Sequence, residues 1–383
     1  MSDLYRSAMH ARIAKLPQLP PDLPGEEDED EDEGSEAADT IGALPSLSTR
    51  HPTPRVPRTP NPEYAPLSGA SFFSEAVQVN VPASKLDVRV YYTPPQTADS
   101  SPGSVMICHH GAGFAGLSFA LFAKEVTKLS KGELGVLSID ARRHGKTMPT
   151  EESSDEDLSL EILVQDLCNL LQVVFPDTTA APSLLLVGHS MGGAVVVDAV
   201  PHLLEARYRV SGVAVLDVVE GTALDALPHM PAILNSRPEG FDSVSDAIEW
   251  HITAHQIRNI LSARVSVPSL VIPTPEPRVR GARAFTWRTP LHTTGPYWEG
   301  WFRGLSASFL AARTARLLVL AGTDRLDREL MIGQMQGKFQ MVVVPNTGHM
   351  LHEDDPWTLA QTLVEFWRRN ERVIVGIKKV GDL

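Results

Sequence analysis

The sequence has 383 residues, of which 34 are Lys or Arg and 47 are Asp or Glu, so the formal net charge is −13. Ten of the acids lie between residues 26 and 39, and without them 37 acidic residues face 34 basic ones, a net charge of −3. A body this close to neutrality has no basic excess to attract nucleic acid, and we expect no nucleic-acid partner. The length allows one large α/β domain or two smaller ones.

Both ends of the chain have the composition of tails. Residues 1–65 combine the acidic run with a proline-rich stretch at 51–60, and we expect them to be disordered because they cannot bury enough apolar surface to offset the ordering entropy. A docking role for the acidic run is the alternative to a solvated tail. Residues 371–383 are expected to form a C-terminal tail, which leaves a folded domain over 70–370.

The two cysteines, Cys108 and Cys168, are too few for a disulfide framework and suit small core positions in a reducing compartment. No apolar run approaches the roughly 20 residues that span a bilayer. The first residues lack the layout of a secretory signal. We therefore expect a cytoplasmic or nuclear protein without a membrane partner.

Apolar runs that alternate with helical segments predict an α/β fold. Residues 77–81 and 86–92 are expected to form two antiparallel strands, and the buried runs after them predict a mostly parallel sheet of about eight strands, with helices on both faces. The later strands are expected at 105–108, 135–139, 184–187, 213–216, 317–321 and 341–344, and helices at 120–129, 158–174 and 194–206.

The motif Gly-x-Ser-x-Gly at 188–192 follows the aliphatic run 184–187. A serine on a sharp strand-to-helix turn is the nucleophile elbow of the α/β-hydrolase fold. A glycine-rich turn beside a strand is the structural alternative, but the apolar run before the motif and the small residues after it favour the elbow. Ser190 is therefore the candidate nucleophile.

A serine nucleophile needs a histidine base, and the base needs an acid that orients it. His349 lies on the loop after the last expected strand, where this fold carries its base, and His352 is its only nearby rival. Two acids follow strands in the required order, Asp217 and Asp324. Position alone favours Asp324, and either carboxylate could instead cap a helix or pair with an arginine.

The glycine-rich loop at 109–113 directly follows the strand 105–108 and matches the oxyanion-loop type of esterases. Backbone N–H groups of Ala112 and Met191 are the expected donors to the oxyanion. The loop lacks the Lys-Ser/Thr ending of a nucleotide-binding loop. The histidines here have no metal-ligand spacing, and we expect neither a metal nor a cofactor.

One long interval, residues 225–312, interrupts the alternation where hydrolases of this fold insert a cap. A helix is expected at about 243–260, followed by a Pro- and Arg-rich loop and an aromatic cluster. Most of these aromatic residues are expected to pack the cap onto the sheet, and some to line a groove. Long insertions with structure of their own are usually functional.

Six further strings lie between residues 217 and 340: DVVEGTA at 217–223, IRN at 257–259, SARV at 262–265, YWEGWFRGLS at 297–306, DRLD at 324–327 and IGQMQGKFQ at 332–340. Together they resemble the protein phosphatase methylesterase family, and the resemblance extends over about residues 70–370. Strings of this length are far more specific than the serine motif.

The resemblance implies an enzyme that hydrolyses the methyl ester on the C-terminal leucine of the type 2A phosphatase catalytic subunit. It carries the nucleophile onto Ser190, the base onto His349 and the acid onto Asp217 in place of Asp324. Because the substrate would be a protein tail, we expect specificity in the insertion. Trp298, Trp301 and Arg303 are the residues we expect to bind the tail.

Two other functions stay open from the sequence. A general esterase for small esters would carry the same three residues, although a lipase lid should be more apolar than this insertion. A protein that mainly sequesters a phosphatase, with secondary catalysis, is the second alternative. Hydrolases with an aspartate nucleophile are excluded because Ser190 occupies that position. We expect a monomer.

Overall fold

The computed structural model describes residues 61–96, 102–150, 153–275, 283–322 and 326–371. The expected N-terminal tail therefore lies outside the described residues except for 61–65, and the expected C-terminal tail except for residue 371. Asp324 also lies outside them.

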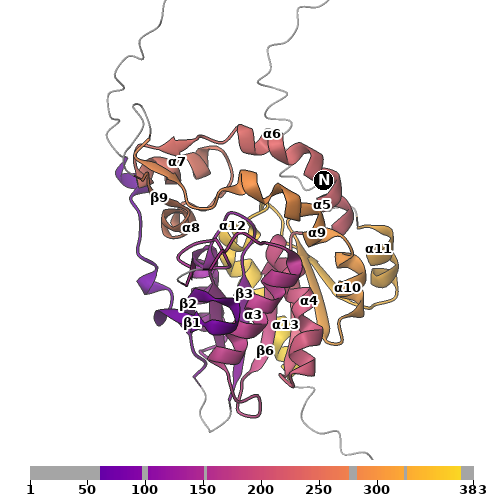
Figure 1. The fold of residues 1–383 in the computed structure, drawn as a ribbon. Coiled ribbons are helices and arrows are strands. Elements are labelled where there is room, and N and C mark those ends of the chain that lie inside the picture. The colour runs from indigo at the N-terminus through magenta and orange to yellow at the C-terminus, as the bar shows by residue number, and fades with distance from the viewer. Residues whose placement is uncertain (1–60, 97–101, 151–152, 276–282, 323–325, 372–383) are drawn as a thin grey trace, which may run out of the picture.

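A mostly parallel sheet forms the centre of the described part, as the sequence predicts (Figure 1). Its main path has the strand order β1-β2-β4-β3-β6-β7-β11-β12, and β5 pairs with β2 beside that path. β1 and β2 pair antiparallel, as do β2 and β4, and the later neighbours are parallel. The strand bounds are β1 (Glu75–Val81), β2 (Leu86–Thr93), β3 (Ser104–His109), β4 (Leu134–Ile139), β5 (Met148–Pro149), β6 (Ser183–His189), β7 (Val210–Leu216), β11 (Ala315–Leu320) and β12 (Gln340–Val343).

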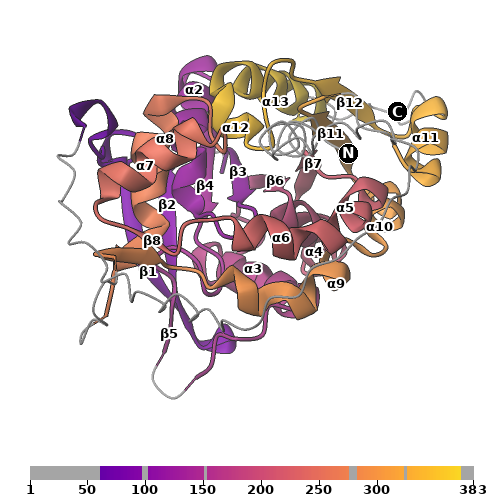
Figure 2. The same ribbon diagram turned by 90° about the horizontal axis from the view of Figure 1, so that it is seen from above.

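Helices cover both faces of this sheet, which explains why β3 and β6 are buried along their whole length. Figure 2 shows α2 (Ala120–Leu129) and α13 (Pro356–Glu371) on one side of the strands, and α3 (Leu160–Val174) and α4 (Met191–Glu205) on the other. Successive side chains of a strand enter opposite cores. In β6, Leu184 and Leu186 pack toward α3 and α4, whereas Leu185 and Val187 pack toward α2 and α13.

The insertion between β7 and β11 crosses the upper edge of the sheet in Figure 1, where α6 and α7 are labelled. It contains a second sheet with the order β8-β10-β9, which the sequence did not predict because its strands have only two or three residues. Its elements are α5 (Glu220–Ala226), α6 (Met230–Asn235), β8 (Gly240–Phe241), α7 (Val244–Thr253), α8 (Ile260–Ser266), β9 (Val271–Pro273), β10 (Phe285–Trp287), α9 (Trp298–Phe302) and α10 (Leu305–Ala311).

The prediction of one continuous helix over 243–260 is wrong. α7 ends at Thr253 and α8 begins at Ile260. Between them His255 takes a φ of 52°, which is incompatible with a right-handed helix. Asn259 then caps the second helix, since its Oδ1 accepts hydrogen bonds from the N–H groups of Leu261 and Ser262.

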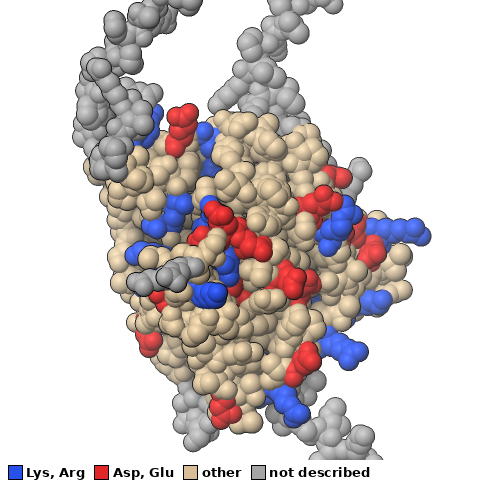
Figure 3. Space-filling view, viewed as in Figure 1, with Lys and Arg blue, Asp and Glu red and all other residues tan. Residues whose placement is uncertain are grey.

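The remaining α-helices of the described part are α11 (Arg328–Met335) and α12 (Leu351–Asp354), the latter directly after the loop that carries His349. In the view of Figure 3, basic and acidic side chains are interspersed on the described surface and form no large patch of one sign. Within the described ranges, no helix is both long and apolar enough to cross a bilayer.

Candidate active site

Ser190 is the single residue between β6, which ends at His189, and α4, which begins at Met191. Its backbone has φ 52° and ψ −119°, a combination that L residues rarely adopt. Two backbone hydrogen bonds hold the turn: Ser190 N–H donates to Leu216 O at 3.1 Å, and Gly193 N–H donates to Ser190 O at 2.8 Å. The strained turn is the nucleophile elbow that the sequence predicts.

The two glycines of the motif are required by close backbone approach. A Cβ on Gly188 would lie 2.1 Å from the carbonyl oxygen of Gly192, and a Cβ on Gly192 would lie 2.3 Å from the carbonyl oxygen of His109. Both contacts are with backbone, which cannot swing aside as a side chain can. The elbow therefore packs directly against the end of β3.

Asp217 lies directly after β7 and holds His349. Its Oδ2 is 2.8 Å from Nδ1 of His349, whose ring donates because a carboxylate only accepts. Its Oδ1 accepts a hydrogen bond from the N–H of Ala321 at 2.8 Å. The Asp217 side chain is 0% exposed and that of His349 is 23% exposed, so the ring still reaches the cavity. Nδ1 thus faces the acid, which leaves Nε2 as the nitrogen free to take a proton.

The structure describes His352, the rival candidate for the base, but not Asp324, the rival candidate for the acid. His352 is buried and is not among the residues that line the cavity of Ser190. Its ring stacks on Phe119 with 4.4 Å between the centroids. Asp324 lies outside the described residues, whereas Asp217 contacts His349.

Three contacts hold the loop before His349 in place. Asp354 accepts hydrogen bonds from the N–H of Gly348 and from the N–H of Arg258, each at 2.7 Å. The Arg258 guanidinium donates to the carbonyl oxygen of Asn346 at 2.8 Å. Arg258 belongs to the insertion, so the insertion and the histidine loop are directly connected.

A histidine that the sequence analysis overlooked also contacts this loop. Nε2 of His189 lies 2.8 Å from the carbonyl oxygen of His349, and the two ring centroids are 4.5 Å apart. Burial holds the pKa of His189 well below its ordinary value. A neutral ring that donates from Nε2 therefore joins the elbow to the base.

The expected oxyanion loop is held by two further buried histidines. Gly113 N–H donates to Nε2 of His144 at 2.9 Å, and the other ring nitrogen of His144 donates to Arg142 O at 2.7 Å. His110 donates to Gly111 O at 2.8 Å and accepts from the N–H of Ala141 at 2.9 Å. Burial lowers the pKa of His144 to about 4, which keeps its Nε2 available as an acceptor at neutral pH.

Two backbone N–H groups remain open beside Ser190. Among the described residues, neither the N–H of Ala112 nor that of Met191 has a hydrogen-bond partner. Both residues line the same cavity as Ser190. N–H groups that are fixed and unpaired can stabilise a negative oxygen in this cavity.

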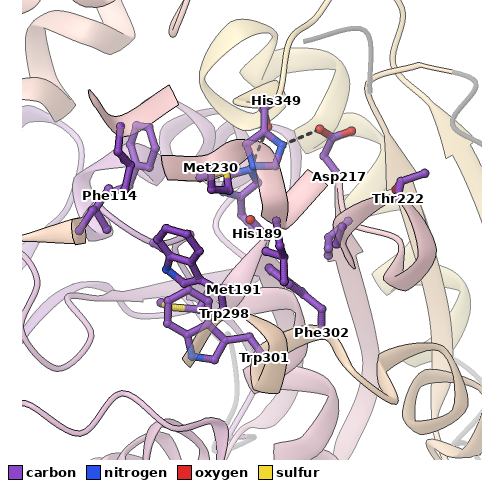
Figure 4. Close-up of a pocket in the computed structure, with 18 of the residues that line it drawn as sticks. Phe114, His189, Met191, Asp217, Thr222, Met230, Trp298, Trp301, Phe302 and His349 are labelled. Atoms are coloured by element: carbon purple, nitrogen blue, oxygen red, sulfur yellow. Dashed lines mark hydrogen bonds and ion pairs between the residues drawn. The ribbon is translucent and has the colours of Figure 1, made fainter. Parts of the chain in front are cut away.

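The cavity has a volume of about 190 Å³. Its walls are mainly apolar, as Figure 4 shows. Ser190, Asp217 and His349 lie at it together. Figure 4 labels Phe114, Met230, Trp298, Trp301 and Phe302 around it. Apolar walls around a polar centre suit the side chain of an apolar acyl group.

The three residues expected to bind a tail differ in position. Trp298 and Trp301 line the cavity, and Arg303 does not. Trp301 is only 2% exposed, and its indole N–H donates to Leu158 O at 2.6 Å, so it forms a fixed wall. Arg303 is exposed and forms an ion pair with Glu299. Within the described ranges, no cluster of three or more potential metal ligands occurs.

Comparison with known proteins identifies the family. A family model described as the alpha/beta hydrolase family matches residues 106–360. Protein phosphatase methylesterase 1 of Cryptococcus neoformans var. neoformans serotype D (strain JEC21) is 48% identical over 344 residues, which cover 83% of this chain and 82% of that protein. The chain belongs to the protein phosphatase methylesterase family. The enzyme of the same name from Aspergillus fumigatus is 44% identical over 397 residues, covering 100% of this chain and 93% of that protein.

Solved structures agree with the fold of this methylesterase family member. E-2-(acetamidomethylene)succinate hydrolase superposes with a TM-score of 0.58 at 19% identity, covering 76% of this chain and 98% of that one. The thioesterase domain from the curacin biosynthetic pathway gives a TM-score of 0.55 at 17% identity, covering 76% and 99%. At such identities the likeness concerns the α/β-hydrolase fold alone.

Proposed function

We propose that this chain is a serine carboxylesterase that hydrolyses the methyl ester on the C-terminal leucine of the type 2A protein phosphatase catalytic subunit. The observation that carries the proposal is the contact between Asp217 and His349 at the cavity that also holds Ser190. The names of the methylesterase relatives support the substrate class.

In the first half of the reaction, Ser190 Oγ attacks the ester carbonyl carbon while its proton passes to Nε2 of His349. Asp217 keeps the imidazole in the tautomer that leaves Nε2 free and stabilises the imidazolium that forms. The oxyanion accepts hydrogen bonds from the N–H groups of Ala112 and Met191, each worth about 3 kcal/mol in the transition state. When the C–O bond breaks, the methoxide takes the proton from His349 and leaves as methanol.

In the second half, a water molecule attacks the acyl-Ser190 carbonyl and gives a proton to His349. The second tetrahedral intermediate breaks its bond to Ser190 Oγ, which recovers the proton from the imidazolium. The product is a free C-terminal carboxylate and the enzyme returns to its starting state. Neither half of the reaction requires a cofactor or a redox partner.

The shape of the cavity supports an apolar terminal residue as the acyl group. Trp298 and Trp301 would contact that residue, since both line the cavity. Arg303 would contact only a part of the phosphatase outside the cavity, because it is exposed and does not line it. Replacing Arg303 with Ala tests this last role: an unchanged rate on a tail peptide and on the whole phosphatase would argue against it.

Relative turnover of two substrates separates this proposal from a general esterase. We expect a peptide ending in leucine methyl ester to be cleaved with a much higher kcat/KM than a short nitrophenyl ester. Equal or reversed values would favour the general esterase. The Ser190→Ala variant should lose activity on both substrates.

The sequestering alternative needs a different measurement. If the chain acts mainly by binding a phosphatase, stoichiometric Ser190→Ala protein should inhibit phosphatase activity as strongly as the wild type does. If methyl-ester hydrolysis is the main function, a catalytic amount of wild type should demethylate an excess of phosphatase.

A further inference from the structure

Arg237 is the one Lys or Arg among the described residues that line the cavity of Ser190. It follows α6 in the insertion, and its backbone N–H donates to Leu234 O at 3.0 Å. The other titratable groups among the described residues that line this cavity are Asp217, His349 and His189. These three are already engaged with one another. The charge of Arg237 therefore has no role in the hydrolysis described above.

The guanidinium of Arg237 lies against the rings of two tryptophans, Trp287 and Trp250. Its central carbon lies 3.6 Å from the ring centroid of Trp287 and 6.0 Å from that of Trp250. The two indoles meet edge to face, with 5.7 Å between their centroids. Trp287 is itself fixed, since its N–H donates to Pro238 O at 2.7 Å. Stacking on fixed rings restrains where the guanidinium can point, and it contributes cation–π attraction.

The guanidinium has no anionic partner within the part of the chain that the structure describes. No carboxylate of a described residue lies within ion-pair distance of it, and it donates no hydrogen bond to a described residue. Three other described arginines differ: Arg142 pairs with Asp166, Arg258 with Asp354, and Arg283 with Asp242. Burial lowers the pKa of Arg237 only to about 10, so it is charged at neutral pH.

A half-buried cation without a partner is unfavourable for the free protein, because desolvation is not offset by an ion pair. The cost is removed if a ligand supplies the anion. A guanidinium offers two parallel N–H donors that match the two oxygens of a carboxylate. The open cavity beside Arg237 is the route by which such a carboxylate can reach it.

We propose that Arg237 binds the carboxylate of an acidic side chain in the substrate, on a residue that precedes the methyl-esterified C-terminus. This inference rests on the proposed function. A methyl ester carries no charge, so in the uncleaved substrate the anion must come from a side chain. Arg237 is then a specificity residue of the same cavity, and it selects tails with an acidic residue at one position.

Peptide methyl esters test this directly. A single glutamate is moved one position at a time along the residues that precede the ester, and each peptide is compared with its glutamine counterpart. We expect one position at which the wild type prefers glutamate over glutamine, by roughly 10- to 100-fold in kcat/KM, the range of hydrogen bonds to charged groups. The preference should weaken as salt is added.

Three variants accompany the peptides. Arg237→Gln should lower the ratio of kcat/KM for the glutamate peptide to that for the glutamine peptide to about one, and this ratio cancels any loss that affects both peptides equally. Arg237→Lys should keep part of the preference for glutamate, because lysine retains the positive charge but lacks the two parallel N–H donors of the guanidinium. Arg313→Gln, at an exposed position between α10 and β11, is the matched control and should behave as wild type.

The outcomes separate the two proposals. If the wild type cleaves glutamate and glutamine peptides equally at every position, or if Arg237→Gln slows both equally, the inference about Arg237 is wrong and the methylesterase proposal stands. If the wild type cleaves the nitrophenyl ester and none of the peptides, the methylesterase proposal fails. A free-carboxylate peptide without acidic side chains that inhibits wild type but not Arg237→Gln would assign Arg237 to the product carboxylate and overturn the inference.

Discussion

His189 donates a hydrogen bond from its Nε2 to the carbonyl oxygen of His349, at 2.8 Å. The residue before the candidate nucleophile therefore holds the loop of the candidate base. The two rings also lie against each other, with their centroids 4.5 Å apart. Since β6 and the loop after β12 belong to distant parts of the chain, this bond sets the relative position of the elbow and the base.

Loss of that bond should slow catalysis with little effect on substrate binding. We expect His189→Phe to keep the ring contact and lose the hydrogen-bond donor. Loss of one buried hydrogen bond should lower kcat by roughly tenfold and leave KM nearly unchanged. His189→Gln retains an N–H donor and should recover much of the rate. Steady-state kinetics on a leucine methyl ester peptide would show this. A Gln variant as slow as the Phe variant would contradict a positioning role for His189.

The assignment of the acid gives a comparison between two single changes. Asp217→Asn removes the acceptor that fixes the His349 tautomer, and we expect kcat to fall by a factor on the order of 10⁴, as in other serine hydrolases with this arrangement. Asp324→Asn, the rival from position alone, should leave kcat within a few-fold of the wild type. Circular dichroism spectra of both variants would check that they are folded. A large loss with Asp324→Asn and a small one with Asp217→Asn would reverse the assignment.

Two glycine-to-alanine changes should have opposite effects on stability. In Gly188→Ala the new Cβ would meet the Gly192 carbonyl oxygen at 2.1 Å, so we expect strong destabilisation and loss of the elbow. Gly300 lies in α9 with nothing within 4 Å of the new Cβ, and Gly300→Ala should stabilise by about 0.5–1 kcal/mol through helix propensity. Denaturant unfolding measures both. A neutral Gly188→Ala variant would contradict the tight turn.

The buried His352 should make the protein less stable in acid. Burial lowers its pKa from 6.5 to about 3. Between these values the unfolded chain binds a proton that the folded chain does not, so this contribution to stability is complete above pH 6.5 and is lost as the pH falls toward 3. His352→Phe keeps a ring against Phe119 and removes the titration.

Denaturant unfolding at about pH 7 and about pH 5 tests this. The free energy of unfolding should drop less between the two pH values in His352→Phe than in the wild type. Equal drops would show that His352 does not contribute to the acid sensitivity.

Much of the fold could be predicted because buried parallel strands leave continuous aliphatic runs in the sequence. The run at 184–187 is the clearest case, and it also locates the elbow. The small sheet of the insertion could not be predicted, since a pair such as Gly240 and Phe241 is too short to show a period. The interruption between α7 and α8 depends on the positive φ of His255, which cannot be predicted from the residue type.

The positions of the candidate residues Ser190 and His349 were predictable, because each follows a strand and has a motif around it. Position alone favoured Asp324 as the acid, and only the resemblance pointed to Asp217, whose carboxylate the structure places against His349. Arg237 was overlooked because its stacking on Trp287 and its lack of an anionic partner among the described residues depend on contacts between separate elements. His189 stood inside the motif, but its bond to the His349 loop joins residues 160 positions apart.

The most direct test of the account is the mass of the C-terminal peptide of methylated type 2A phosphatase catalytic subunit after incubation with this protein. We expect the wild type to remove the methyl group, Ser190→Ala and Asp217→Asn to leave it in place over the same time, and Asp324→Asn to remove it. Retention of the methyl group with folded wild-type protein, or its removal by Ser190→Ala, would contradict hydrolysis through Ser190, His349 and Asp217.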